Sequence, residues 1–198
     1  MRAFQAFLIA IAGLWPMPRN AHAQLYVIRD SKTGIVSEYD AKTGEVINAN
    51  FITGLSRPVA LAVNGNTFFV TNENGGTVGK YDANTGGAIN PGFITGLSGP
   101  EGLALSGNSL LVTNLNGGAV GSGTVGNYDA NTGTAIKPNF ITGLSEPFFL
   151  TLLGNKLFVA NFGSATVGEY DSKTGVAINA SFITGLNNPV GLAVKIAK

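Results

Sequence analysis

The sequence predicts an all-β fold, a four-bladed β-propeller. Three observations support this prediction. One block of sequence recurs four times, the repeating unit is about 42 residues long, and short β-type runs alternate with glycine-rich turns. Units of this length that hold four short strands are typical of propeller blades. The composition, with 28 glycines and only 12% charged residues, also suits a turn-rich β protein.

Two sequence markers define the repeat. The first is Tyr-Asp-x-x-Thr-Gly, which begins at Tyr39, Tyr81, Tyr128 and Tyr170. The second is Phe-Ile-Thr-Gly-Leu, which begins at Phe51, Phe93, Phe140 and Phe182. Both advance by 42, 47 and 42 residues. The repeat units are therefore expected at about 24–58, 59–100, 101–147 and 148–189, with a closing strand at 190–198.

The first 23 residues differ from the repeats. Arg2 precedes an apolar stretch at 7–15, which is too short to span a bilayer, and Ala21-His22-Ala23 follows. This order is typical of a secretory signal peptide that is cleaved after Ala23, although an uncleaved N-terminal anchor is the alternative. The protein is expected to be secreted or periplasmic, without an integral membrane span after cleavage.

Removal of this segment would change the chemistry that is available. It holds the only histidine, the only tryptophan and both methionines, and the whole chain lacks cysteine, so no disulfide can form. Residues 24–198 carry a formal charge of −1 and contain no basic run. This charge argues against nucleic acid and anionic membranes as partners.

Each unit is expected to contain four strands, called A to D in chain order. In the second unit these are 60–63, 68–71, 77–81 and 88–94. A tight turn at 64–66 connects A and B. Strand B is the richest in aromatic and β-branched residues, which favour strands.

The turn between strands C and D is the most uniform part of the repeat. Asp82 at its start can accept hydrogen bonds from backbone amides, Thr85 can add a hydroxyl bond, and Gly86 can take a positive φ. We interpret this turn as a hairpin staple; a ligand site is the alternative. A single carboxylate per turn is a poor calcium site, because Ca²⁺ takes six to eight oxygen ligands.

The linker from strand D to the next strand A carries a proline and a leucine in every unit. Proline fixes φ and stiffens the corner between blades. The leucines are expected to pack between neighbouring blades. The prolines are Pro58, Pro100, Pro147 and Pro189, and the leucines are Leu55, Leu97, Leu144 and Leu186.

The phase of the repeat predicts how the ring closes. The first unit begins at strand B, with residues 25–27, and the chain ends with a strand of type A, residues 191–194. A C-terminal strand that completes the N-terminal blade would leave no unfinished edge. The alternative is that two chains pair into a larger ring.

The segment Thr71 to Val78, running into Tyr81-Asp82, resembles the blades of NHL-repeat propellers. The Gly-Leu-x-x-Pro-x-Gly-Leu-Ala pattern at 185–193 belongs to the same type. Both are similar to bacterial propellers of the virginiamycin B lyase and surface-layer-like groups. The resemblance implies a propeller whose loop faces bind a protein, a glycan or a small molecule, and it is weak for function because such blades host many roles.

The resemblance also implies which metal ligands an enzyme site would need. Lyases of this kind use histidines around a metal, and no histidine follows His22. Gluconolactonase-like propellers instead hold a divalent cation with Glu, Asn and Asp oxygens. No cofactor is therefore expected, and bound Ca²⁺ or Mg²⁺ is the alternative.

The strongest candidates for ligand binding stand at the end of strand B. They are Asn72, Asn114 and Asn161, with Arg29 at the aligned position of the first unit. In a closed ring the four would face a common axis or rim, where Asn can donate and accept and Arg can hold an anion. The alternative is that each Asn ends a strand and caps a turn.

Other departures from the repeat could carry function. The third unit has five extra residues near 121–125, in the B–C loop, and Phe148, Phe149 and Phe162 replace smaller residues. The aromatic residues could form an exposed patch, although the core of the fourth blade is favoured. Glu73, Glu101 and Glu146 are the carboxylates available for acid–base chemistry, and no nucleophile–base pair is evident.

These observations favour an exported binding or scaffold module for a protein, glycan or small-molecule ligand, with no catalytic residue. The alternative is a lactonase- or lyase-like enzyme that depends on a divalent metal. The near-identity of the units favours a scaffold, because an asymmetric reaction needs asymmetric residues. The protein is expected to be a monomer or to self-associate.

Overall fold

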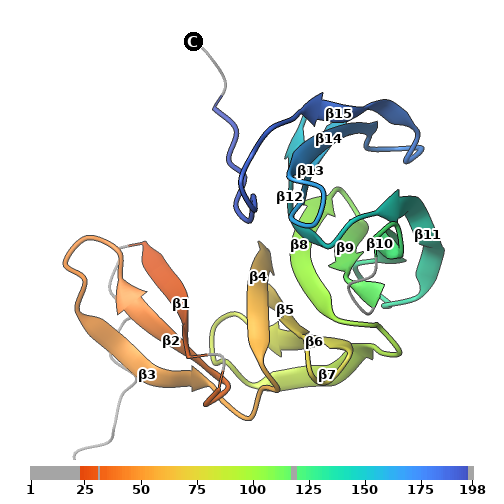
Figure 1. Ribbon diagram of the computed structural model, residues 1–198. Coiled ribbons are helices and arrows are strands. Elements are labelled where there is room, and N and C mark those ends of the chain that lie inside the picture. The colour runs from red at the N-terminus through yellow and green to blue at the C-terminus, as the bar shows by residue number, and fades with distance from the viewer. Residues whose placement is uncertain (1–22, 31, 117–119, 196–198) are drawn as a thin grey trace, which may run out of the picture.

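The computed structural model describes residues 23–30, 32–116 and 120–195 (Figure 1). The predicted signal segment therefore lies almost entirely outside the described residues, as do the last three positions of the predicted closing strand. The described strands are β1 (Gln24–Asp30), β2 (Ile35–Asp40), β3 (Val46–Ile52), β4 (Pro58–Asn64), β5 (Thr67–Asn72), β6 (Thr77–Asp82), β7 (Ala88–Ile94), β8 (Pro100–Ser106), β9 (Ser109–Asn114), β10 (Gly123–Asp129), β11 (Ala135–Leu144), β12 (Pro147–Leu153), β13 (Lys156–Asn161), β14 (Thr166–Asp171) and β15 (Ala177–Ile183).

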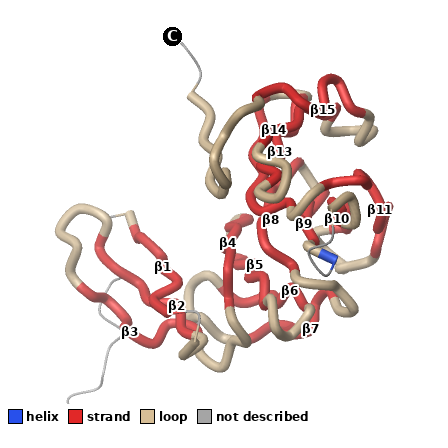
Figure 2. The backbone as a smooth tube through the Cα atoms, viewed as in Figure 1, coloured by secondary structure: helices blue, strands red, loops and turns tan. Residues whose placement is uncertain are grey.

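The strands form four antiparallel sheets, each made from consecutive strands of one repeat. The first is β1-β2-β3, and the others are β4-β5-β6-β7, β8-β9-β10-β11 and β12-β13-β14-β15. Figures 1 and 2 show the four sheets following one another around an arc, with β4, β8 and β12 innermost. The predicted four-bladed all-β fold is confirmed, and the fourth predicted strand of the second unit, 88–94, matches β7.

The predicted closure of the ring is corrected by the structure. The first sheet has three strands, and residues 184–195, which follow β15, contain no strand. Instead of pairing with β1, Leu192 and Val194 line an apolar groove with Phe158 and Phe182 of the fourth blade. The tail therefore stays beside the blade that precedes it, and β1 has a hydrogen-bonded neighbour on one side only.

The turn between strands C and D has the predicted geometry. Asp82 Oδ1 accepts hydrogen bonds from the backbone N–H groups of Asn84 and Thr85 at 2.9 and 2.8 Å, and from the Thr85 hydroxyl at 3.0 Å. Asp129 and Asp171 make the same contacts in their own turns. The staple interpretation is confirmed.

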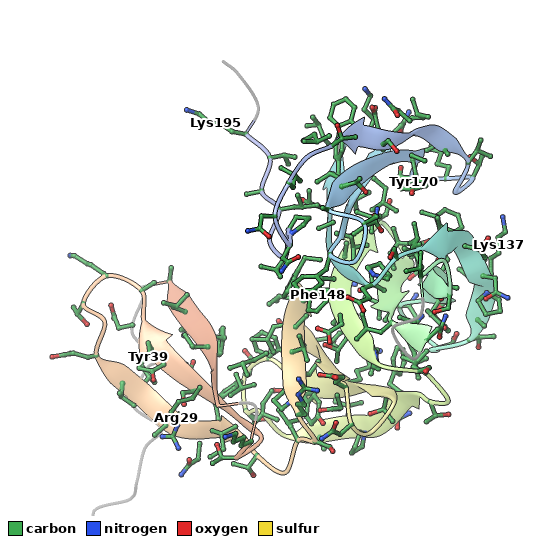
Figure 3. All side chains as sticks on the ribbon, viewed as in Figure 1. Arg29, Tyr39, Lys137, Phe148, Tyr170 and Lys195 are labelled. Atoms are coloured by element: carbon green, nitrogen blue, oxygen red, sulfur yellow. The ribbon has the colours of Figure 1, made fainter. Side chains whose placement is uncertain are left out.

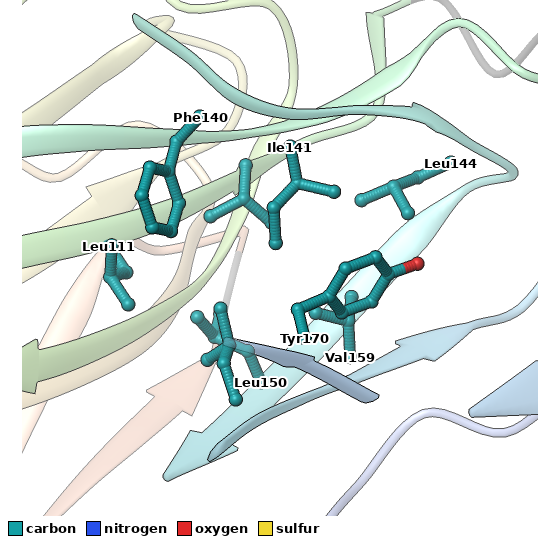
Figure 4. Close-up of a cluster of buried hydrophobic side chains, with 9 residues drawn as sticks. Leu111, Phe140, Ile141, Leu144, Leu150, Val159 and Tyr170 are labelled. Carbon is teal, nitrogen blue, oxygen red and sulfur yellow. The ribbon is translucent and has the colours of Figure 1, made fainter. Parts of the chain in front are cut away.

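The hydrophobic core is divided among the seams between blades. Three clusters of buried side chains lie where the first blade meets the second, the second meets the third, and the third meets the fourth. Figure 4 shows the last of these, in which Phe140, Ile141 and Leu144 of one blade face Leu150 and Tyr170 of the next. Each blade thus buries its apolar face against its neighbour, as repeat units must.

Threonine hydroxyls add polar contacts across two of these seams. The buried Thr113 Oγ1 accepts from Gly102 N–H at 2.7 Å and donates to the carbonyl of Phe148 at 2.6 Å. Thr71 makes the same pair of bonds with Ala60 and Glu101. One side chain therefore joins strand B to its own strand A and to strand A of the next blade.

We expect Thr113→Val to lower the free energy of unfolding by about 1–3 kcal/mol, because it leaves a buried N–H and a half-buried carbonyl without a partner. Chemical denaturation measures this loss. The matched control is Thr95→Val, at an exposed position, which should change stability by less than about 0.5 kcal/mol. Equal effects of the two substitutions would show that the inter-blade bonds are unimportant.

Candidate functional site: a polar pocket inside the arc

A pocket of about 530 Å³ opens on the inner side of the arc, where β4, β8 and β12 and the loops beside them meet β1. It is lined by Ile28, Arg29, Arg57, Pro58, Val59, Glu73, Glu101, Leu115 and Phe148. Its volume is in the range of sites for small molecules. The charged members occupy positions where the four repeats differ, so the pocket is asymmetric although the blades are alike.

Arg57 is held at the pocket by the corner between blades. It precedes Pro58 and has a φ of 53°, in the left-handed region that non-glycine residues rarely occupy. Its carbonyl accepts a hydrogen bond from Glu73 N–H at 3.0 Å, and its guanidinium forms an ion pair with the Glu73 carboxylate. The strained backbone and the ion pair fix the two charges beside one another.

Glu101 is the second carboxyl group of this cluster and is buried. Burial raises its pKa to about 7; the negative charge of Glu73 adds to the rise and the positive charge of Arg57 opposes it. Glu73 Oε2 is a buried acceptor without a hydrogen-bond donor among the described residues. A hydrogen bond from the Glu101 carboxyl group to Glu73 also adds to the rise, because it favours the protonated form of Glu101.

The raised pKa of Glu101 predicts a pH dependence of stability. Because the folded protein holds the Glu101 proton more tightly than the unfolded chain, the free energy of unfolding should fall as pH rises from about 4.5 to about 7. We expect this fall to be roughly 1–3 kcal/mol. Denaturation of the Glu101→Gln variant, which keeps a donor in place, should show a flatter profile across that window. Parallel profiles of the two proteins would contradict a raised pKa of Glu101 in the folded state.

Arg29 lies on β1 and lines the same pocket; Figure 3 labels Arg29 on the first blade and Phe148 on the inner side of the arc. It is exposed, and it makes no hydrogen bond or ion pair with any residue in the described part of the chain. A guanidinium without a partner in a pocket is a ready binding group for a carboxylate, which it can engage through two parallel hydrogen bonds.

The three predicted asparagines do not line this pocket. Asn72, Asn114 and Asn161 are buried, and their amide nitrogens lie 3.2–3.5 Å from the threonine hydroxyls at the start of strand C in the same blade. Their amide oxygens are also buried and have no hydrogen-bond donor among the described residues. The structure thus brings Arg29 to the pocket and not the asparagines, whose role in binding stays a prediction.

The aromatic departures of the fourth unit lie partly at the pocket. Phe148 and Phe162 pack with ring centroids 5.1 Å apart, both rings are half-buried, and Phe148 lines the pocket. The ring is therefore neither fully core nor a free surface patch. The loop between β9 and β10 is longer than its counterparts, as predicted, although residues 123–125 of the predicted insertion belong to β10. Leu115 of this loop also lines the pocket.

Sequence reasoning missed Arg57 and the pairing of Glu73 with Glu101. It named Glu73, Glu101 and Glu146 as available carboxylates without pairing any two of them. The signal that could have found Arg57 was the register between strands A and B. In every blade with an A strand, the proline at the start of A pairs with the asparagine at the end of B. This pairing brings the residues next to these two partners, such as Arg57 and Glu73, side by side.

In the described ranges, no group of three or more His, Cys, Asp or Glu side chains is placed to hold a metal ion. The acidic pair of the pocket does not fit a hard cation, because Glu73 is already ion-paired with Arg57 and burial raises the pKa of Glu101 to about 7. The described residues also include no helix long and apolar enough to cross a membrane.

Comparison with known proteins supports a propeller-like fold class. No family model and no curated protein sequence matches the chain. Among solved structures it is similar to a streptogramin B lyase (22% identity, TM-score 0.63, covering 85% of this chain and 54% of the other). It is also similar to the computationally designed protein Ika8, with 19% identity and a TM-score of 0.60 over 86% of this chain and 52% of the other.

A third similar structure is hydrazine synthase from Kuenenia stuttgartiensis, with 22% identity, a TM-score of 0.55, and coverage of 68% of this chain and 38% of the other. These likenesses support the propeller-like fold and nothing finer. The chain spans about half the length of the lyase and of Ika8.

Proposed function

We propose that the protein is an exported propeller module that binds a small carboxylated ligand, of the size of a sugar acid, in the pocket inside the arc. The observation that carries the proposal is Arg29, a guanidinium in a pocket that has no partner within the described chain. The other arginine of the pocket, Arg57, is already neutralised by Glu73.

The rest of the pocket supports a ligand that is polar at one end and apolar at the other. With Glu101 protonated, the two arginines and Glu73 give the pocket a net positive charge, which attracts an anion. Val59, Leu115 and the half-buried ring of Phe148 provide apolar surface. Polar and apolar side chains therefore share the lining, which suits a small ligand that carries both kinds of surface.

Calorimetric titration with D-glucuronate and D-galacturonate tests the proposal, with D-glucose and D-galactose as uncharged probes of the same size. We expect the acids to bind and the neutral sugars to bind at least tenfold more weakly. Arg29→Gln should weaken binding of the acids at least about tenfold, because it removes the bidentate charged contact.

The matched control is Lys42→Gln, which removes an exposed cation from the same blade outside the pocket. It should leave the affinity within about twofold, since exposed charges at a distance are screened. Equal losses for the two variants would point to general charge attraction instead of a site. Absence of binding by every acid would overturn the proposed ligand class.

The alternative function, a metal-dependent lactonase- or lyase-like enzyme, draws only on the fold shared with a lyase. Thermal melting with Ca²⁺, Mg²⁺, Mn²⁺ or Zn²⁺, compared with EDTA, separates the two. A cation that binds only the folded protein raises the melting temperature by mass action. We expect no rise, since the acidic pair is a poor donor set; a rise that EDTA reverses would favour the enzyme.

A further inference from the structure

Each end of the arc exposes an apolar face whose equivalents in the other blades are buried. Phe182 and Ile183 of β15 are 47% and 43% exposed, whereas the equivalent pairs of the other three blades are buried. On the other end, Leu25 and Val27 of β1 are exposed, although their counterparts in β5, β9 and β13 have no exposed area. The molecule thus has three filled seams between blades. At each end of the arc one blade face has no neighbouring blade, and we call such a face a half-seam.

The two half-seams carry the same residue types that contact each other in the filled seams, so the two faces are complementary. In each filled seam the Phe-Ile pair of one blade packs against strand B of the next. The carbonyl of each phenylalanine also fits against a glycine of the next blade: a Cβ on Gly86, Gly133 or Gly175 would lie 1.8–2.3 Å from the oxygen of Phe51, Phe93 or Phe140. The remaining glycine of this set, Gly44, has nothing within 4 Å of its Cβ direction, and the remaining carbonyl is that of Phe182.

Backbone register makes the fit specific. Pro58, Pro100 and Pro147 pair with the last residue of the neighbouring strand B, which places Pro189 opposite Arg29. The pairs Leu61–Val70, Leu103–Val112 and Leu150–Val159 likewise place Leu192 opposite Val27. The tail after β15 therefore has the sequence of the missing inner strand of the first blade.

We propose that a second copy of the chain occupies these faces, so that the tail of each copy pairs with β1 of the other and two arcs form one eight-bladed ring. Two features favour a second copy over closure within one chain. The tail lies in the groove beside Phe158 and Phe182, and the first and last blades leave their faces exposed.

This pairing would remove the open edge of β1 and bury both half-seams, and a twofold axis would generate both new seams at once. It would also complete the pocket, because Pro189 of the second copy would lie beside Arg29. The interface does not depend on the proposed ligand, so the two proposals can fail separately.

Disulfide trapping tests the pairing directly, because the chain has no native cysteine. The variant is Val27→Cys combined with Leu192→Cys in the full chain, oxidised and run on a non-reducing gel. We expect a covalent dimer that thiol reductant converts to monomer. A disulfide within one chain would establish closure inside the monomer, and no disulfide would show that the tail does not pair with β1; either result overturns the proposal.

The single-cysteine variants measure random collision, because neither position faces its own copy in the predicted ring. A second measurement requires no cross-link. Light scattering of the unmodified chain should give twice the chain mass at high concentration. Gly44→Ala should weaken this dimer more than tenfold, whereas Gly54→Ala, which has a similar φ of 75° and open space around it, should not. A monomer at all concentrations would contradict the proposal.

Discussion

Replacing Gly86 by alanine should unfold the protein or lower its free energy of unfolding by several kcal/mol. The added methyl group would lie 1.8 Å from the carbonyl oxygen of Phe51 in the preceding blade. That neighbour is backbone and cannot rotate away, so the two blades would have to separate. Separation would open the buried cluster that contains Phe51, Phe68 and Tyr81.

Gly96→Ala is the matched control. Gly96 has a φ of 74°, close to the 72° of Gly86, but nothing lies within 4 Å of its Cβ direction. It should therefore cost only the conformational penalty of a left-handed alanine, about 1–2 kcal/mol. Urea denaturation of both variants gives the comparison, and similar losses would show that blade contact at Gly86 is unimportant.

The second large effect is expected for Phe140→Ala. The ring is 4% exposed and lies in the cluster between the third and fourth blades, with Ile141 and Leu157 (Figure 4). Truncation of a buried phenylalanine leaves a cavity and should cost about 3–5 kcal/mol. Thermal or chemical denaturation measures the loss.

The same substitution at the equivalent position of the last blade provides the control. Phe182 is 47% exposed, so Phe182→Ala should cost less than about 1.5 kcal/mol in dilute protein, where the half-seam is open. At high concentration its cost should grow if a second copy covers the ring. If Phe140→Ala and Phe182→Ala lowered the free energy of unfolding equally at every protein concentration, the view that stability resides in the filled seams would be contradicted.

Much of the fold was predictable because each blade repeats the same short-range contacts. The Asp82 turn depends on side-chain hydrogen bonds within four residues, so its geometry is local and readable from sequence. The pairing of strands within a blade is nearly as local. Closure of the ring was not predictable in this way, because it depends on the rotation between blades, which the packing of Phe140 and its equivalents sets.

The site was only partly predictable for a similar reason. Arg29 stood out because it departs from the repeat, and the structure places it in the pocket. The asparagines were predicted from their shared position, but a shared position serves shared structure, here a contact with strand C of the same blade. The pairing of Glu73 with Glu101 joins two different blades, and no spacing within one unit encodes it.

The measurement that tests the central claim most directly is nuclear magnetic resonance of the arginine side chains during titration with D-glucuronate. Beyond the first 23 residues the chain has only two arginines, Arg29 and Arg57, so the guanidinium signals are easily resolved. We predict a saturable shift of the Arg29 signal that the Lys42→Gln variant retains, with a smaller change at the ion-paired Arg57. An unmoved Arg29 signal, with changes confined to loops outside the pocket, would contradict the assignment of the pocket as the ligand site.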